Sequence, residues 1–396
     1  GNSALFVTPS GRKVRDIAYD LGADSWAGRD VGILAGHLFE GAQVEEWAYA
    51  RDPDSIVWCV RSDGVLLGFT YLKEHDVYAW SRHITDGAVE SVCAIQEKNE
   101  TALYLSVRRT VTGQTVRYVE RLVSRQFLGG GVADVHAAWC VDSGRRDDGW
   151  NVDPAKTLAI ASVAPGATYA AGNTVALSAS GHAPFSATSL GQKLILRLGQ
   201  VQTTVTVTAF TDPGHATATL DTAAPPAVQD IPLADWAAAK ASLSGLWHLE
   251  GRSVAILADG SVQPPATVVN GMVAIPRAAG RILAGLPYVC DLETLDIESG
   301  GAAGTPTLQG RTKRVQEVVL RVKATRGLAV GPSAGHLTEI KERAAENLGA
   351  PTVLTTGDER VLIDPSWNSS GRLLVRQAWP LPATIVAVAP RLEVGE

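Results

Sequence analysis

The stretch DPDSIVWCVRSDGVLLGFTY at residues 52–71 sets the pattern for the first part of the chain. Two apolar runs, Ser55–Val60 and Val65–Thr70, flank the turn signal Ser62-Asp63-Gly64. Asp-Gly between such runs predicts a tight β-hairpin, because glycine adopts positive φ without a steric penalty. Residues 44–49 and 77–82 extend the pattern on both sides, so we expect four short antiparallel strands.

A second block follows the same plan, with strand-like runs at 89–95, 101–107 and 115–120. A repeat of about 40–45 residues with four strands is typical of a β-propeller blade. We therefore predict a mainly β fold with β-propeller blades over residues 1–125. A short helical pattern, Val31–Leu38, predicts one or two helical turns between strands.

The rest of the chain divides by composition. Residues 126–150 are rich in glycine and aspartate and predict a linker around one strand, Ala137–Val141. Residues 151–245 are dominated by Ala, Thr, Ser and Val and predict an inserted small all-β module of barrel or sandwich type. This module is expected to end in a short helix, Ala234–Lys240. Residues 246–396 predict a β-rich platform or ring domain.

The platform region carries clear hairpin signals. Asp259-Gly260 and Asn270-Gly271 each stand between apolar runs. Val315–Arg326 alternates apolar and charged residues, which favours a strand. His336–Asn347 is rich in Glu, Arg and Ala and predicts one helix. The fold class is therefore mainly β with few helices.

The composition of the chain limits the classes of function that it can have. The chain has 396 residues, of which 45% are hydrophobic and 19% charged, which indicates globular domains with buried cores. The net charge of −6 is spread along the chain. It gives no basic face for gripping nucleic acid. No run approaches the ~18–20 apolar residues that span a bilayer, so we expect no membrane segment.

The four cysteines lie far apart and form no CxxC pair. This spacing excludes the usual zinc motifs and argues against a disulfide framework, so we predict buried free thiols. Position 1 is Gly, and the single methionine is Met272. We therefore expect residue 1 to lie inside a longer native protein or to be left by processing.

Two patterns in the sequence are candidates for catalytic sites. Asp291 and Glu293 alternate on a predicted strand, so they face the same side, and two carboxylates on one face suit glycoside hydrolysis. Asp142-Ser143-Gly144 lacks the Gly-x-Ser-x-Gly nucleophile elbow. Asp, Ser and Gly are also ordinary turn residues. The prediction is that the chain has no catalytic residues and is not an enzyme.

Three further patterns are candidates for binding sites. Gly129–Gly131 lacks the Lys and helix of a phosphate-binding loop, so no cofactor is expected. His75 and His83 flank one strand, where a turn and rim role is favoured over a metal site. Aromatic side chains gather in the first blade, where core packing is favoured over a stacking platform for sugars or bases. They are Trp47, Trp58, Tyr71, Tyr78 and Trp80.

Several longer segments resemble the C-terminal portion of tail nozzle (tail tube) proteins of short-tailed, podovirus-type bacteriophages. They are LFVTPSGRKVRDIAYD (5–20), the stretch at 52–71, LEGRSVAILADGSV (249–262), GLPYVCDLETL (285–295) and VRQAWPLPATIVAVAPRLE (375–393). The resemblance covers residues 1–140 and 246–396. Residues 151–245 depart from the simplest members and resemble a small β-barrel module.

The resemblance implies a structural virion protein of the phage tail. It implies a homohexameric ring that extends the DNA-ejection channel below the portal. Its expected partners are the tail adaptor protein, tail fibres or spikes, and double-stranded DNA that passes without tight binding. The alternative is a carbohydrate-binding or glycan-cleaving tail appendage, a spike or fibre; a secreted propeller lectin is a third possibility. The inserted module is expected to decorate the outside of the ring; the alternatives are that its Thr/Ser-rich strands bind glycan or are simply solvated.

Overall fold

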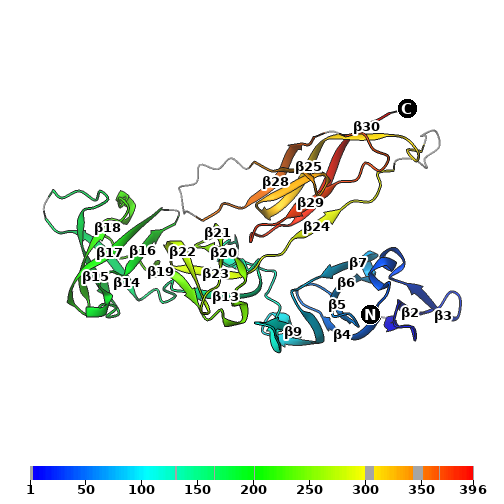
Figure 1. The fold of residues 1–396 in the computed structure, drawn as a ribbon, viewed down its shortest axis with the longest axis horizontal. Coiled ribbons are helices and arrows are strands. Elements are labelled where there is room, and N and C mark those ends of the chain that lie inside the picture. Colours follow the sequence, from blue (N-terminus) through cyan, green and yellow to red (C-terminus); the bar gives the residue numbers. More distant parts are fainter. Residues whose placement is uncertain are drawn as a thin grey trace. The chain divides into compact units, whose positions relative to one another are not determined.

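The computed structural model describes residues 3–129, 132–164, 166–199, 201–298, 307–341, 351–364 and 366–395. These residues form a mainly β protein with short 3-10 helices, which confirms the predicted fold class. The chain divides into two compact units, Gly1–Gln126 and Phe127–Glu396 (Figure 1). None of the helices formed by the described residues has the length and apolar character needed to cross a bilayer.

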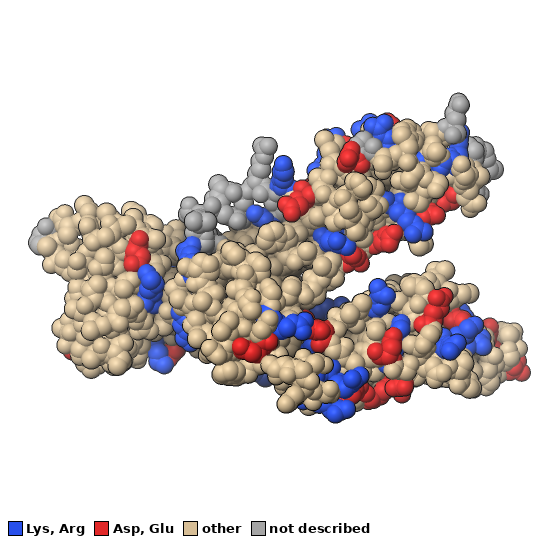
Figure 2. Space-filling model, viewed as in Figure 1, with Lys and Arg blue, Asp and Glu red and all other residues tan. Residues whose placement is uncertain are grey.

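Acidic and basic side chains are interspersed on the surface. On the face shown in Figure 2, Lys and Arg lie beside Asp and Glu, and neither sign gathers into one continuous patch. Many arginines contact a carboxylate on a neighbouring strand. Examples are the pairs Arg108–Glu90 at 3.0 Å and Arg321–Asp358 at 2.7 Å.

Unit 1 contains three antiparallel sheets in which each strand pairs with its neighbour in the chain. The first sheet is β1 (Ser3–Val7), β2 (Val14–Asp20) and β3 (Ser25–Asp30). The 3-10 helix η1 (Ile33–Phe39) follows. The second sheet is β4 (Val44–Ala50), β5 (Ile56–Arg61), β6 (Leu66–Leu72) and β7 (Val77–His83), with η2 (Lys73–His75) before β7. The third is β8 (Ala88–Glu97), β9 (Glu100–Val111) and β10 (Gln114–Arg121).

The sheet β4–β7 is the middle layer of unit 1, and side chains on both of its faces are buried. On β5, Val57 and Cys59 enter a core shared with β2 and η1. The alternate residues Ile56, Trp58 and Val60 enter a second core, shared with β8 and β9. Because strand side chains alternate between faces, this unbroken apolar run packs against two layers at once. The stacked sheets and the Asp63-Gly64 hairpin agree with the predicted strand pattern.

Unit 2 is built around a four-stranded sheet of order β13-β23-β20-β21. Its strands are β13 (Asp142–Asp148), β20 (Ser253–Ala258), β21 (Ser261–Thr267) and β23 (Arg281–Leu286). We call this the central sheet. One face packs on β22 (Met272–Ala279) through Ile256, Ile282 and Val273. The other face packs on Val135 and Leu381. The predicted Asp259-Gly260 turn joins β20 to β21.

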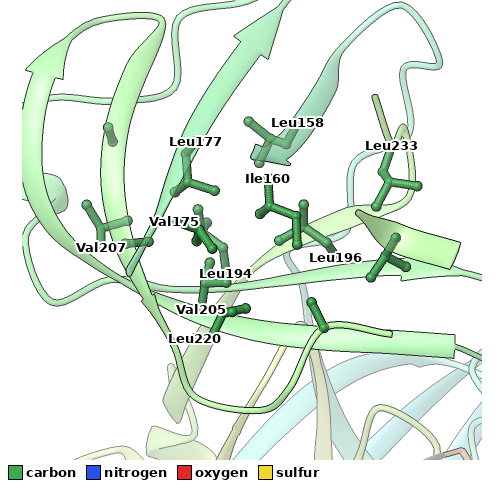
Figure 3. Close-up of a cluster of buried hydrophobic side chains, with 14 of the residues drawn as sticks. Leu158, Ile160, Val175, Leu177, Leu194, Leu196, Val205, Val207, Leu220 and Leu233 are labelled. Atoms are coloured by element: carbon green, nitrogen blue, oxygen red, sulfur yellow. The ribbon is translucent and has the colours of Figure 1, made fainter. Parts of the chain in front are cut away.

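The inserted module lies in the chain between β13 and β20. Its strands are β14 (Thr157–Ser162), β15 (Thr174–Ser180), β16 (Lys193–Leu198), β17 (Val201–Asp212), β18 (His215–Leu220) and β19 (Trp236–Ser244). The sheet curls around an apolar core, part of which Figure 3 shows. Leu158 of β14 and Leu233, just before β19, exchange two backbone hydrogen bonds of 2.9 and 2.8 Å. The sheet therefore nearly meets itself.

The strand β19 belongs to two parts of unit 2. Its first half pairs with β16 of the inserted module, and its second half pairs with β22 from the region that follows. One continuous strand thus carries the hydrogen-bond ladder out of the module and into the layer that covers the central sheet.

The C-terminal part is a sandwich of two antiparallel sheets. One has the order β24-β29-β26-β27, from Cys290–Glu293, Leu374–Gln377, Leu328–Ser333 and His336–Glu339. The other has the order β28-β25-β30, from Thr355–Leu362, Lys313–Thr325 and Ile385–Val394. Val318 and Leu320 of β25 pack against Val330 of β26 and Val375 of β29.

Two predicted helices are wrong in the described residues. Ala234–Lys240 was predicted as a helix, but Trp236–Ser244 is strand β19. The alanines lose their helical preference because β16 and β22 supply ladder partners along the strand. The helix predicted at His336–Asn347 begins instead with strand β27 (His336–Glu339), which pairs with β26. Residues 342–347 of that prediction lie outside the described residues.

Two further predictions need correction. The strand predicted at Ala137–Val141 lies instead at β13 (Asp142–Asp148), which pairs with β23. The residues of β13 are mostly polar, so they lack the apolar pattern that indicates a strand. They form one because their side chains bind partners on neighbouring elements. The cysteines are free, as predicted, but only Cys59 is fully buried, whereas Cys93 and Cys290 are exposed.

Candidate functional site

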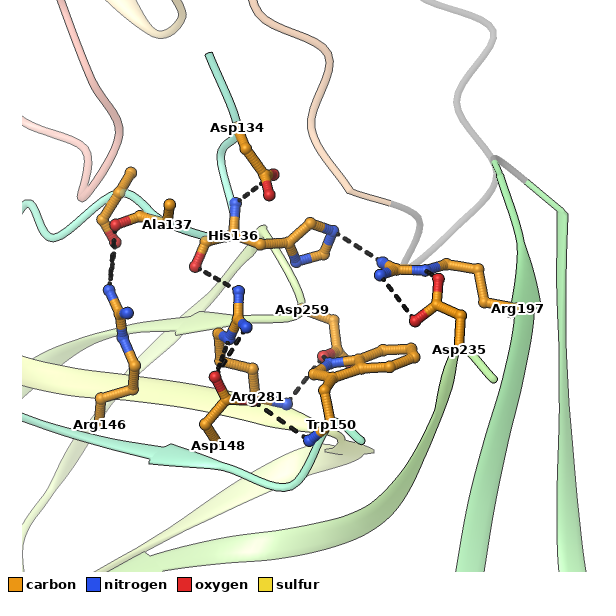
Figure 4. Close-up of polar contacts among 11 residues, drawn as sticks. Asp134, His136, Ala137, Arg146, Asp148, Trp150, Arg197, Asp235, Asp259 and Arg281 are labelled. Carbon is orange, nitrogen blue, oxygen red and sulfur yellow. Dashed lines mark hydrogen bonds and ion pairs between the residues drawn. The ribbon is translucent and has the colours of Figure 1, made fainter. Parts of the chain in front are cut away.

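A polar junction joins the inserted module to the central sheet. Trp150 follows β13, and its indole Nε1 donates a 3.0 Å hydrogen bond to the carboxylate of Asp259 (Figure 4). Asp259 begins the β20–β21 turn and is buried. It also accepts from the backbone N–H groups of Gly280 at 2.9 Å and Arg281 at 2.8 Å. Three donors from two separate parts of the chain thus converge on one buried carboxylate.

The module contributes a second set of contacts. The guanidinium of Arg197, at the end of β16, lies over the Trp150 ring with its Cζ 4.1 Å from the ring centroid. The same guanidinium donates two hydrogen bonds, of 2.7 and 3.2 Å, to Asp235. Its remaining terminal nitrogen lies 3.1 Å from Nε2 of His136. Arg197 therefore contacts an aromatic face, a carboxylate and an imidazole together.

The segment before β13 contributes the third set of contacts at the junction. The carbonyl oxygen of His136 accepts a 2.8 Å hydrogen bond from Arg281, whose guanidinium also pairs with Asp148 of β13 at 2.7 Å. Burial, followed by the nearby Arg197 cation, lowers the pKa of His136 from its ordinary value. His136 is therefore neutral at neutral pH.

A glycine makes the close approach at the junction possible. A Cβ on Gly280 would lie 2.6 Å from Cβ of Ala237 and 2.8 Å from the Trp150 indole nitrogen. Both distances are shorter than real Cβ contacts allow, so any larger residue would push the module away from the central sheet. What this arrangement does chemically is to give the Trp150 indole and the backbone N–H groups of Gly280 and Arg281 an acceptor, and to hold two β elements together.

The junction was missed from the sequence. Trp150, Arg197, Asp235 and His136 belong to no local motif, and the side-chain hydrogen bonds that join them across the junction span 38 to 145 residues of the chain. The Asp259-Gly260 turn was the one available signal. It identified the hairpin but not the partners of its carboxylate.

Both members of the acid pair considered for glycoside hydrolysis contact an arginine. Asp291 and Glu293 lie on β24 and face the same side, as expected. Asp291 accepts two 2.7 Å hydrogen bonds from Arg376, and Glu293 lies 3.5 Å from Arg372. The bonds from Arg376 lower the pKa of Asp291. A general acid needs a raised pKa, so Asp291 is poorly suited to that role.

The other weighed patterns are not brought together as sites. Ser143 is the second residue of β13, and its carbonyl oxygen, not its hydroxyl, lies 2.8 Å from Nε2 of His248. His75 lies in η2 before β7 and His83 ends β7, so the length of a strand of about 20 Å separates them. Within the described residues, no three His, Cys, Asp or Glu side chains are arranged to hold a metal ion.

The aromatic residues of the first blade pack in the cores of unit 1, as predicted. Trp58 is buried, and Trp80 stacks on Phe69 with ring centroids 4.2 Å apart. Trp47, Tyr71 and Tyr78 pack against the same core as Phe69. These rings pack against the buried side chains between the sheets of unit 1.

A shallow hollow lies at one end of unit 1. It is lined by Asp52, Trp58, Glu100 and Arg125 among others, and its volume is about 50 Å³. Pockets that bury small ligands usually measure about 300–1,000 Å³. The hollow holds little more than solvent-sized molecules.

Comparison with known proteins gives little further guidance. No family model and no curated protein matches the chain. Among solved structures, the chain is similar to Trypanosoma rangeli sialidase, with 11% sequence identity over 99% of this chain and 81% of that chain. The TM-score of this match is 0.17, which is too low to support an argument about fold or function.

Proposed function

We propose that the chain is a structural subunit of a bacteriophage tail, forming the nozzle ring through which DNA leaves the virion. The observation that supports this proposal is that the polar side chains hold β elements together. Asp259, Arg197, Asp291 and Arg376 all fix one β element against another. Together with the sequence resemblance to tail nozzle proteins, this supports a mechanical role for the chain.

The layered sheets suit a wall that keeps its shape. In unit 1 the middle sheet is packed on both faces, and in unit 2 both faces of the central sheet are covered. Protein interiors packed in this way have low compressibility. A ring of such subunits would stay open while DNA passes.

The pairing of charges suits a channel that does not hold DNA. Duplex DNA carries one charge per ~1.7 Å, and each lysine or arginine that binds a phosphate adds to the affinity. Arg117, Arg321, Arg360 and Arg376 each lie within 2.7 Å of a carboxylate oxygen. Arginines paired in this way are less available to phosphates, which favours a propeller-and-platform conduit of low affinity.

The first test is the oligomeric state. We expect the purified chain, imaged by negative-stain electron microscopy, to form rings with six-fold symmetry and a central opening. Sedimentation in the same buffer should give the mass of six 41.7 kDa chains. A stable monomer in both measurements, or a trimer of the kind that appendages form, would count against the nozzle role.

The second test concerns the glycan-cleaving alternative. We expect no release of reducing ends when the purified chain is incubated with capsular or lipopolysaccharide glycans of candidate hosts, because Arg376 holds Asp291 as a paired carboxylate. Asp291→Asn and Glu293→Gln should give the same baseline as the wild type. Cleavage by the wild type that Asp291→Asn abolishes would support the appendage instead.

A further inference from the structure

The contact between His136 and Arg197 depends on which nitrogen of His136 carries a proton. Nη1 of Arg197 lies 3.1 Å from Nε2 of His136 (Figure 4). A guanidinium only donates hydrogen bonds, so Nε2 must accept, and the proton of the neutral ring must be on Nδ1. Nδ1 is buried and has no hydrogen-bond partner among the described residues.

Protonation would remove the acceptor. A protonated imidazole carries N–H groups on both nitrogens, so Nε2 and Arg197 would face each other as two donors and two cations. Arg197 is fixed by Asp235 and by the Trp150 ring, so His136 would have to move. The charged groups around His136 come from several elements. They are Arg197 on β16, Asp235 before β19, Asp259 in the β20–β21 turn, Arg281 on β23, Arg146 and Asp148 on β13, and Asp134 on its own segment.

Most of these charges are already matched with each other. Asp235 is engaged by Arg197, Asp148 by Arg281, and Asp259 by Trp150 and two backbone N–H groups. Asp134 uses an oxygen to accept from the backbone N–H of His136 itself. Asp134 and Asp259 favour the protonated imidazole of His136, but burial and the Arg197 cation outweigh them, so the pKa of His136 is lowered.

We propose that His136 and Arg197 form a pH-sensitive latch between the segment before β13 and the inserted module. The latch is closed when His136 is neutral and opens when His136 takes up a proton. Opening frees the segment around His136 from β16, while the Trp150–Asp259 bond and the β19–β22 ladder stay in place. The module then gains freedom at one side without leaving the protein.

The direction of the pH effect follows from proton uptake. Burial and the Arg197 cation lower the pKa of His136 in the folded protein below its ordinary value of 6.5. The open or unfolded form therefore binds more protons than the closed form between these two pKa values. The contact is fully present above pH 6.5 and weakens as the pH falls toward the folded pKa, by up to about tenfold per pH unit.

Hydrogen exchange on the full chain tests the latch. We expect the amides of residues 134–138 to lose protection between pH 7.5 and pH 5.5, after correction for the intrinsic exchange rate. His136→Gln keeps an acceptor near the position of Nε2 but does not titrate, so its protection should change little over the same range. His37→Gln replaces an exposed histidine of unit 1 and should behave as the wild type.

A second measurement tests the latch even if one of the variants folds poorly. The histidine ring resonances of the wild type report the pKa of His136 directly by NMR. Arg197→Met removes the neighbouring cation and should raise that pKa. Equal loss of protection in the wild type and His136→Gln, or an unchanged His136 pKa in Arg197→Met, would overturn the latch.

Discussion

Replacing Asp259 by alanine should destabilise unit 2 by on the order of 3–5 kcal/mol. The substitution leaves the Trp150 indole and the backbone N–H groups of Gly280 and Arg281 without their common acceptor. A buried donor without a partner costs about 1–3 kcal/mol, and three are affected. Differential scanning calorimetry should show the corresponding transition fall by roughly 10 °C.

Asp24→Ala is the matched control. Asp24 and Asp259 both have a backbone φ of 46°, so alanine meets the same left-handed strain at either position. Asp24 is exposed, and its carboxylate accepts only from Tyr19 among the hydrogen bonds found. Its substitution should cost less than about 1 kcal/mol. Asp259→Asn should fall between the two, because it keeps one acceptor but turns an amide donor toward Gly280. An Asp259→Ala protein as stable as Asp24→Ala would show that the junction contributes nothing.

Phe69→Ala should destabilise unit 1 by about 3–5 kcal/mol. The Phe69 side chain is fully buried in the middle sheet and stacks on Trp80. Its removal leaves a cavity between the β4–β7 sheet and η1, since the neighbouring rings are themselves held by hydrogen bonds. Trp80, for example, donates to the carbonyl oxygen of Val31 at 2.9 Å.

Hydrogen exchange in peptides from β4 to β7 should report the loss, because it reads unit 1 separately from unit 2. Phe6→Ala is the control in the same unit. Phe6 lies on β1 and is 38% exposed, so its truncation removes much less buried surface. Similar exchange in the two variants would mean that the middle sheet is not the stabilising layer of unit 1.

The sequence predicted the strands of unit 1 well but not their packing. The run Ile56–Val60 is apolar throughout, and both the flanking turns and the β-branched residues favoured a strand. An unbroken apolar strand must be covered on both faces, but nothing local indicates which elements cover it. Those partners, η1 on one side and β8 with β9 on the other, depend on contacts between distant parts of the chain.

The errors have the same physical origin. The alanines before Lys240 favour a helix in isolation, yet β16 and β22 offer backbone partners along both halves of β19. The polar run Asp142–Asp148 does not look like a strand, yet Asp147 and Asp148 bind Lys240 and Arg281. Tertiary hydrogen bonds and ion pairs override local preference at both places.

The candidate site was the least predictable part. A buried carboxylate in a turn, a tryptophan after a glycine and an arginine at a strand end are each common. Their meeting at Asp259, Trp150 and Arg197 is a property of the fold and not of any short motif.

The two ends of the inserted module meet at a single point. The backbone N–H of Asn151 donates to the carbonyl oxygen of Trp236 at 2.8 Å, and the Asn151 side chain donates to that of Ala234 at 2.9 Å. The chain therefore departs and returns almost where it left. We expect this layout to let the inserted module be replaced in evolution by another folded domain, or shortened to a loop. Either change would alter the path of the surrounding backbone little.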